Sequence, residues 1–290
     1  MQPRSEERKQ NQERRSTMAI GDISLTAGMR QNLLSLQETN KQTSITQNRL
    51  ATGKKVNTPL DNPTNYFAAQ GHLQRAGDLD IRKDGMSEAV QMLNAANAGI
   101  KGIQNLINSA QGVATSAMAT TNTLEQSAYA NTFNTLLSQI NQLASDSGYK
   151  GTNFLTNGSQ TVEFGQRTGA ATLGINGFVA TSTGLNLSST SAANWSTTSN
   201  IMTDAGKLES ALSTLRTQAS ALSASLSVVT TRQDFTDTMI NTLQIGADNL
   251  TLADTNEEGA NMLMLQTRQN LGISSLSMAS QAAQAVLRLF

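Results

Sequence analysis

The feature that most constrains this chain is a heptad pattern of apolar residues running from Leu208 to Leu250. Positions separated by alternating steps of four and three residues are apolar almost throughout, and only Gln233 and Thr236 interrupt them. Such a pattern places one apolar stripe along a long helix. At about 1.5 Å per residue, the predicted helix is a rod of roughly 65 Å, which must pack on other helices. We expect its intrachain seam to consist of Leu208, Leu212, Leu215, Leu222, Leu226, Val229, Ile240, Leu243 and Leu250.

A partner for this rod is predicted earlier in the chain. Apolar residues between Leu79 and Ala117 are mostly three, four or seven positions apart, which is typical of a helix. Another helix is expected over roughly 127–145, because its apolar residues recur with the same helical spacing. The segment 53–63 is predicted to be a loop, since Pro59 and Pro63 favour an extended backbone in the residue before each.

The region 152–206 differs in composition, because Gly, Thr, Ser and Asn become frequent. Thr161–Phe164 and Thr172–Ile175 favour strands, and the glycines between them indicate turns. We predict a hairpin or small sheet, followed by a polar connection over 188–200. The expected fold class is mainly α, with long antiparallel coiled-coil helices from both termini and a small β-hairpin region in the middle.

Both ends of the chain carry narrow apolar stripes at helical spacing. A single helix cannot bury its own apolar stripe, so each stripe needs another helix to pack against. The apolar carboxyl end also suggests burial, because chain ends are normally solvated. We therefore predict that the terminal helices pack between copies of the chain. The residues expected to pack are Leu25, Met29, Leu33 and Leu36 near the start, and Leu265, Leu276, Ala283, Val286 and Phe290 near the end.

The leading segment 1–17 is highly charged and has no large apolar side chain after Met1. It cannot bury enough surface to fold alone. We interpret it as a disordered tail or a mis-assigned start, with Met18 opening the natural chain.

Composition argues against several classes of function. The chain has no Cys and one histidine, His72, which excludes nearly all common zinc sites and Cys–His catalysis. The net charge of zero argues against a general nucleic-acid binder. No apolar run reaches the roughly 18–20 residues of a membrane span. Asp234 and Asp237 are interpreted as a solvated edge rather than a metal site. We expect no enzyme activity, no cofactor, no metal, no nucleic acid and no membrane partner.

Two blocks at opposite ends of the sequence carry a family resemblance. The first reads RLATGKKVN over Arg49–Asn57 and is followed by Asp61. The second opens with Ala253, Asp254 and Glu258 and closes with QAAQAVL over Gln281–Leu287. Together they resemble bacterial flagellin, the filament subunit of the flagellum.

The resemblance implies a subunit that self-assembles into the helical flagellar filament used for swimming, in a short form with little or no variable outer domain. It implies secretion to the extracellular flagellum. The implied partners are copies of the chain, the flagellar export apparatus with its chaperone, and the hook-associated and cap proteins. The corresponding domains are the 1–17 tail, an inner-core helix over 18–58, outer-core helices over 59–151, the hairpin region 152–206, a long outer-core helix over 207–250 and an inner-core helix over 251–290.

Three alternatives remain open at this point. A hook–filament junction protein shares the terminal architecture, although a weaker match to both blocks would be expected. A chemoreceptor-type signalling rod shares the heptads, but no transmembrane anchor is found in the sequence. An enzyme carried on the same scaffold would need a catalytic insert such as HExxH, and none is present.

Overall fold

The computed structural model describes residues 27–165, 171–191 and 193–287, with the side chains of Val286 and Leu287 excepted. The chain divides into two compact units. Unit 1 joins the two ends of the chain, up to Ala68 and from Asp248, and unit 2 spans Ala69–Ala247. The elements are α2 (Ala27–Thr52), α3 (Pro63–Ala119), α4 (Thr123–Asp146), β1 (Ser159–Glu163), β2 (Thr172–Asn176), α5 (Thr198–Thr251) and α6 (Thr255–Leu287).

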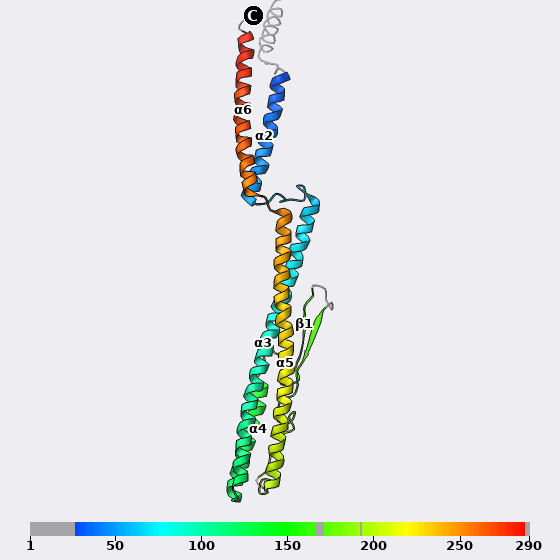
Figure 1. Ribbon diagram of the computed structural model, residues 1–290, viewed down its shortest axis with the longest axis vertical. Coiled ribbons are helices and arrows are strands. Elements are labelled where there is room, and N and C mark those ends of the chain that lie inside the picture. Colours follow the sequence, from blue (N-terminus) through cyan, green and yellow to red (C-terminus); the bar gives the residue numbers. More distant parts are fainter. Residues whose placement is uncertain (1–26, 166–170, 192, 288–290) are drawn as a thin grey trace, which may run out of the picture. The chain divides into compact units, whose positions relative to one another are not determined.

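Heptad burial patterns organise unit 2. The buried residues of α3 follow steps of three, four or seven, with Gly99 beside Ile100 as the exception, and those of α4 alternate between three and four. On α5, every position of the predicted seam is buried or half-buried. Figure 1 shows α3, α4 and α5 side by side. Because each helix presents one continuous apolar stripe, the three stripes meet along a shared core.

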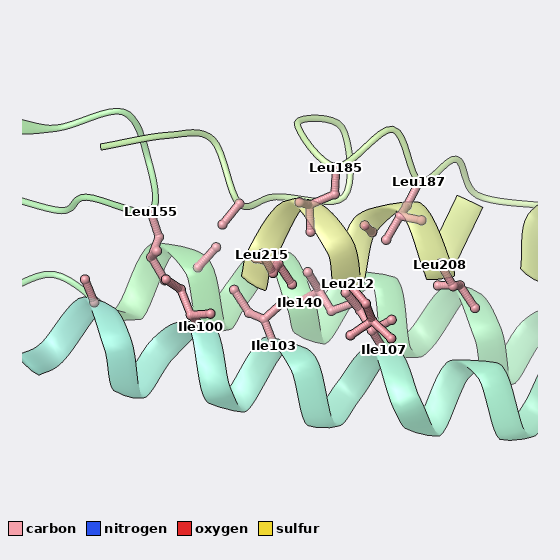
Figure 2. Close-up of a cluster of buried hydrophobic side chains, with 14 of the residues drawn as sticks. Ile100, Ile103, Ile107, Ile140, Leu155, Leu185, Leu187, Leu208, Leu212 and Leu215 are labelled. Carbon is pink, nitrogen blue, oxygen red and sulfur yellow. The ribbon is translucent and has the colours of Figure 1, made fainter. Parts of the chain in front are cut away.

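The centre of this core is built from β-branched and leucine side chains (Figure 2). Ile100, Ile103 and Ile107 of α3 point toward Ile140 of α4 and toward the leucines of α5. Leu155, Leu185 and Leu187 close the core from the connecting segments. Most of these side chains are fully buried, each contributing about 1.5–3 kcal/mol of hydrophobic stabilisation.

The two polar positions of the α5 seam have hydrogen-bond partners. The Nε2 atom of Gln233 donates to Oγ of Ser87 on α3 at 2.9 Å. The hydroxyl of Thr236 donates to the carbonyl oxygen of Arg232 at 2.8 Å. The interruption of the heptad is therefore compatible with burial, because neither polar group loses its partner.

The middle region forms the predicted hairpin. Strands β1 and β2 pair antiparallel, with Val162 opposite Leu173 and Gln160 opposite Ile175. Val162 and Ile175 are buried, whereas their chain neighbours are exposed or half-buried, as expected for a two-stranded sheet with one covered face. The predicted fold class is confirmed.

The segment after the hairpin is more ordered than the expected polar connection. Trp195 is fully buried against Phe133, with the ring centroids 4.9 Å apart, and its indole N–H donates to Asp204 at 2.9 Å. Asn134 of α4 holds the segment by two hydrogen bonds to the backbone of Thr190. Helix α5 consequently begins at Thr198, ahead of the start at 207 expected from the heptads alone.

Helix α3 also begins earlier than the sequence pattern indicated. The loop ends at Asn62, whose side chain accepts a hydrogen bond from the amide of Asn65 at 3.0 Å. Pro63 occupies the first helical position, where its missing N–H leaves no bond unmade. The same proline that predicts a loop before it therefore starts a helix after it.

In unit 1, α2 and α6 lie side by side and antiparallel (Figure 1). Arg49 meets Glu258, Asn40 meets Gln269, and Leu36 meets Gly272, so the residue number rises on one helix as it falls on the other. None of the described helices combines the length and apolar character that crossing a membrane requires.

Candidate subunit-packing surface

The first sequence block and the opening of the second come together at one junction in unit 1. The backbone of Gly53–Val56 pairs with that of Thr251–Ala253: Lys55 N–H donates to Thr251 at 2.8 Å, and Ala253 N–H donates to Gly53 at 2.9 Å. Gly53 has a φ of 67°, a left-handed conformation in which L side chains are strained. The glycine thus ends α2 and turns the chain onto the segment that precedes α6.

Charged side chains secure the same junction. The Arg49 guanidinium binds the Glu258 carboxylate at 2.8 Å, and the Glu258 side chain is only 7% exposed. Asp254 caps the start of α6 by accepting from the amides of Asn256 and Glu257. Glu257 and Glu258 lie in the first turn of α6, where the helix dipole favours negative charge.

Asp61 organises the loop that follows. Its Oδ2 atom accepts from the amide of Thr58 at 2.8 Å and from the amide of Asn57 at 3.0 Å. These two backbone hydrogen bonds hold the pKa of the Asp61 carboxyl below its ordinary value, because they stabilise the charged form. The acidic residue of the first block therefore has a structural role in the loop.

Between the terminal helices the seam is narrow. Leu36 packs directly over Gly272, where an added Cβ would lie 2.7 Å from the Leu36 Cδ2 atom. Leu265 is 6% exposed, and the Gln269 amide donates to Asn40 at 2.9 Å. A groove of about 320 Å³ runs beside this contact and is bordered by Leu36, Leu271 and Arg268.

The residues predicted to pack between subunits divide into distinct groups. Met29 and Leu265 are buried within the chain, and Leu36, Leu276 and Ala283 are half-buried. Leu33 remains 39% exposed. Leu25 and Phe290, together with the side chain of Val286, lie outside the described residues. Part of the predicted stripe is therefore covered within the chain, and Leu36 packs over Gly272 of the other terminal helix.

A second apolar surface lies outside this seam. Met264, Leu271 and Met278 are seven residues apart, so they share one face of α6, and they are 44%, 64% and 61% exposed. We call these three residues the outer column. Leu263 and Ile273 on α6 and Leu34 on α2 are also well exposed. The residues predicted to pack between subunits did not include this surface, although apolar residues repeat there every seven positions beside the seam.

The described residues show no arrangement for metal chemistry. No group of three or more His, Asp or Glu side chains in this part of the chain is placed to hold a metal ion. Asp237 instead forms a hydrogen-bonded ion pair with Lys83, and this interaction raises the pKa of the lysine because it stabilises the charged form. Asp234 is exposed and His72 is half-buried on α3.

Most of the chain matches one protein family. Residues 23–161 match the bacterial flagellin N-terminal helical region, and residues 205–290 match the bacterial flagellin C-terminal helical region. These matches include both sequence blocks.

Full-length relatives agree with these matches. Flagellin FljM of Caulobacter vibrioides is 28% identical over 274 residues, covering 94% of this chain and 100% of that protein. A flagellin of Brucella melitensis is 26% identical over 270 residues, covering 89% and 95% respectively. Among solved structures, the crystal structure of Bacillus cereus flagellin matches with a TM-score of 0.43 at 17% identity, covering 52% of this chain and 88% of that chain.

Proposed function

This chain belongs to the bacterial flagellin family and is a self-assembling subunit of the flagellar filament, and on this premise we propose that neighbouring subunits pack against the exposed apolar faces of α2 and α6. Helices α2 and α6 already pack against each other along one narrow stripe of residues. Among the described residues, other apolar side chains of these helices stay exposed, and we propose that another copy covers them in the filament.

The observation that supports this proposal is the outer column. Leu271 and Met278 are each more than half exposed, and few other large apolar side chains of α6 are buried. Burying a leucine or methionine side chain stabilises a structure by about 1.5–3 kcal/mol. Each contact is modest, but it repeats in every subunit of a long assembly.

The low burial of apolar side chains on α2 and α6 also predicts how these helices behave before assembly. Isolated helices depend on tertiary packing for most of their stability. Since α2 and α6 bury few large side chains in the described structure, we expect both helices to open readily in the free subunit and to become fully ordered on polymerisation. Folding of the ends is then coupled to assembly.

We propose that this packing is heterologous, so that two different surfaces of neighbouring subunits meet. A heterologous contact that does not close on itself produces an open helical filament. We further propose that the chain is secreted through the flagellar export apparatus with its chaperone, that it adjoins hook-associated and cap proteins, and that it has no enzyme activity. The family matches support these roles over a hook–filament junction protein.

The test is a charge placed in the outer column. Leu271→Asp should leave the free subunit folded, because the side chain is 64% exposed there. It should abolish polymerisation, since an unpaired carboxylate in an apolar contact loses its solvation. Sedimentation under polymerising conditions measures filament yield, and circular dichroism of the subunit measures its helix content.

The matched control is Leu124→Asp at the start of α4 in unit 2, where the leucine is 80% exposed. This variant should polymerise like the parent chain. If Leu271→Asp formed filaments with the same yield as Leu124→Asp, the outer column would not be a subunit contact.

A further inference from the structure

We propose that Met264 and Met278 are oxidative modification sites, and that their conversion to methionine sulfoxide by hydrogen peroxide or a similar two-electron oxidant blocks subunit addition. This inference rests on the proposed function, because it requires the outer column to be a subunit contact. It adds a chemical condition under which that contact fails.

The sulfur chemistry of the chain is confined to thioethers. The sequence has eleven methionines and no cysteine, so no thiol competes for the oxidant. Met264 and Met278 are 44% and 61% exposed on α6. By contrast, Met86 in the core of unit 2 is fully buried, and Met29 is 7% exposed. Exposure therefore separates the methionines into reactive and protected groups.

The reaction needs only the peroxide. The thioether sulfur attacks one peroxide oxygen, a sulfur–oxygen bond forms, and the oxygen–oxygen bond breaks. After proton transfer the second oxygen leaves as water. Sulfur loses two electrons and the peroxide gains two, so the products are one methionine sulfoxide and one water.

Geometry makes this small change effective. Met264 and Met278 flank Leu271 at a spacing of seven residues, so they lie one heptad on either side of it along the same face of α6. Oxidation turns a flexible apolar side chain into a polar one. Two of the three outer-column residues would then present an S=O dipole to an apolar neighbour, and this polar group would lack a hydrogen-bond partner.

The free subunit and the filament should differ in reactivity. In the free subunit the oxidant reaches both sulfurs directly. Once a neighbour covers the outer column, both side chains are removed from solvent and their oxidation slows. Oxidation therefore acts on subunits before incorporation and leaves the assembled filament intact.

The experiment treats full-length free subunits with hydrogen peroxide, locates sulfoxides by peptide mass spectrometry, and measures polymerisation by sedimentation. In the parent chain, the critical concentration should rise at least about tenfold when Met264 and Met278 are oxidised. Incubation with the methionine sulfoxide reductases MsrA and MsrB should restore assembly. Preformed filaments should show slower oxidation at both residues than free subunits.

The variant Met264→Leu combined with Met278→Leu supplies the main comparison. Leucine conserves volume and apolar character, and the effect of peroxide on this variant is measured against the critical concentration of the same variant without peroxide. After peroxide treatment this variant should still polymerise. The matched control is Met202→Leu in unit 2, where the methionine is 64% exposed; this variant should stay as sensitive as the parent chain.

Two outcomes would overturn the inference: full assembly of the parent chain with both residues oxidised, or equal sensitivity of the double leucine variant. Either result is separable from failure of the proposed function. Leu271→Asp tests the outer column without oxidant, so loss of assembly in that variant beside normal assembly of oxidised subunits would reject the oxidation inference only.

Discussion

Single residues at close contacts set the geometry of unit 1, and Gly272 shows this most directly. Its missing side chain makes room for Leu36, and a Cβ at that position would meet the leucine at 2.7 Å. Gly259 on the same helix has nothing within 4 Å of the equivalent position. The two glycines therefore carry different constraints, although both lie inside α6.

Alanine substitutions should separate these constraints. Gly259→Ala should stabilise α6 by about 0.5–1 kcal/mol, because alanine lowers the entropy cost of the helix. Gly272→Ala should give less or none of this gain, since Leu36 must move. In a Leu36→Ala background the gain at Gly272 should return. Hydrogen exchange of α6 amides in the free subunit measures the stability change in each of these variants. Equal effects of alanine at both glycines would contradict the close contact between Gly272 and Leu36.

At the scale of elements, the loop between α2 and α3 depends on one carboxylate. Asp61 accepts two backbone amides, and its pKa is lowered by them, first by Thr58 and then by Asn57. Because the pKa of Asp61 is lower in the folded state, its ionised carboxylate stabilises the loop at pH values above the unfolded-state pKa. This contribution is lost as the pH falls through the folded value.

The loop should therefore loosen in acid below about pH 4, the ordinary range of aspartate. Amide exchange and chemical shifts of Thr58 and Asn57, followed by NMR between neutral and acidic pH, report the transition. Asp61→Asn should remove the acid-dependent step at these two amides. Asp80→Asn, on an exposed part of α3, should leave it in place. A loop unchanged by acid in the parent chain would refute the role of Asp61.

At the scale of the whole molecule, the two units differ in how much large apolar side chain they hide. Unit 2 contains a continuous core in which Ile100, Ile103 and Ile107 are at most 1% exposed. Unit 1 relies on Met29, Val56, Leu265 and the junction, while the outer column stays open. Local stability follows burial, so the two units should not open together.

Hydrogen exchange should resolve this difference. In the free subunit, amides of α2 and α6 should exchange at least about a hundredfold faster than those of α3 between Met86 and Ala117. In filaments the terminal amides should become protected, because neighbours cover their apolar faces. Equal protection of both units in the free subunit would contradict coupled folding and assembly.

Much of the helical architecture could be predicted from the spacing of apolar residues. The α5 seam, the partner stripe on α3 and the hairpin strands all follow from periods of 3.5 and 2. The start of α5 could not be placed in this way, because it depends on a hydrogen bond from Trp195, which lies ahead of the periodic segment, to Asp204. Such contacts leave no periodic trace in the sequence.

The sequence by itself determined that both ends are helical, that each carries a narrow apolar stripe, and that the chain resembles flagellin. It did so because helical periodicity and motif residues are local properties of a chain. Only the tertiary structure decided which apolar residues face inward. Leu265 is buried and Leu276 half-buried, whereas Leu271 stays 64% exposed, since pairing of two helices covers only part of the surface of each.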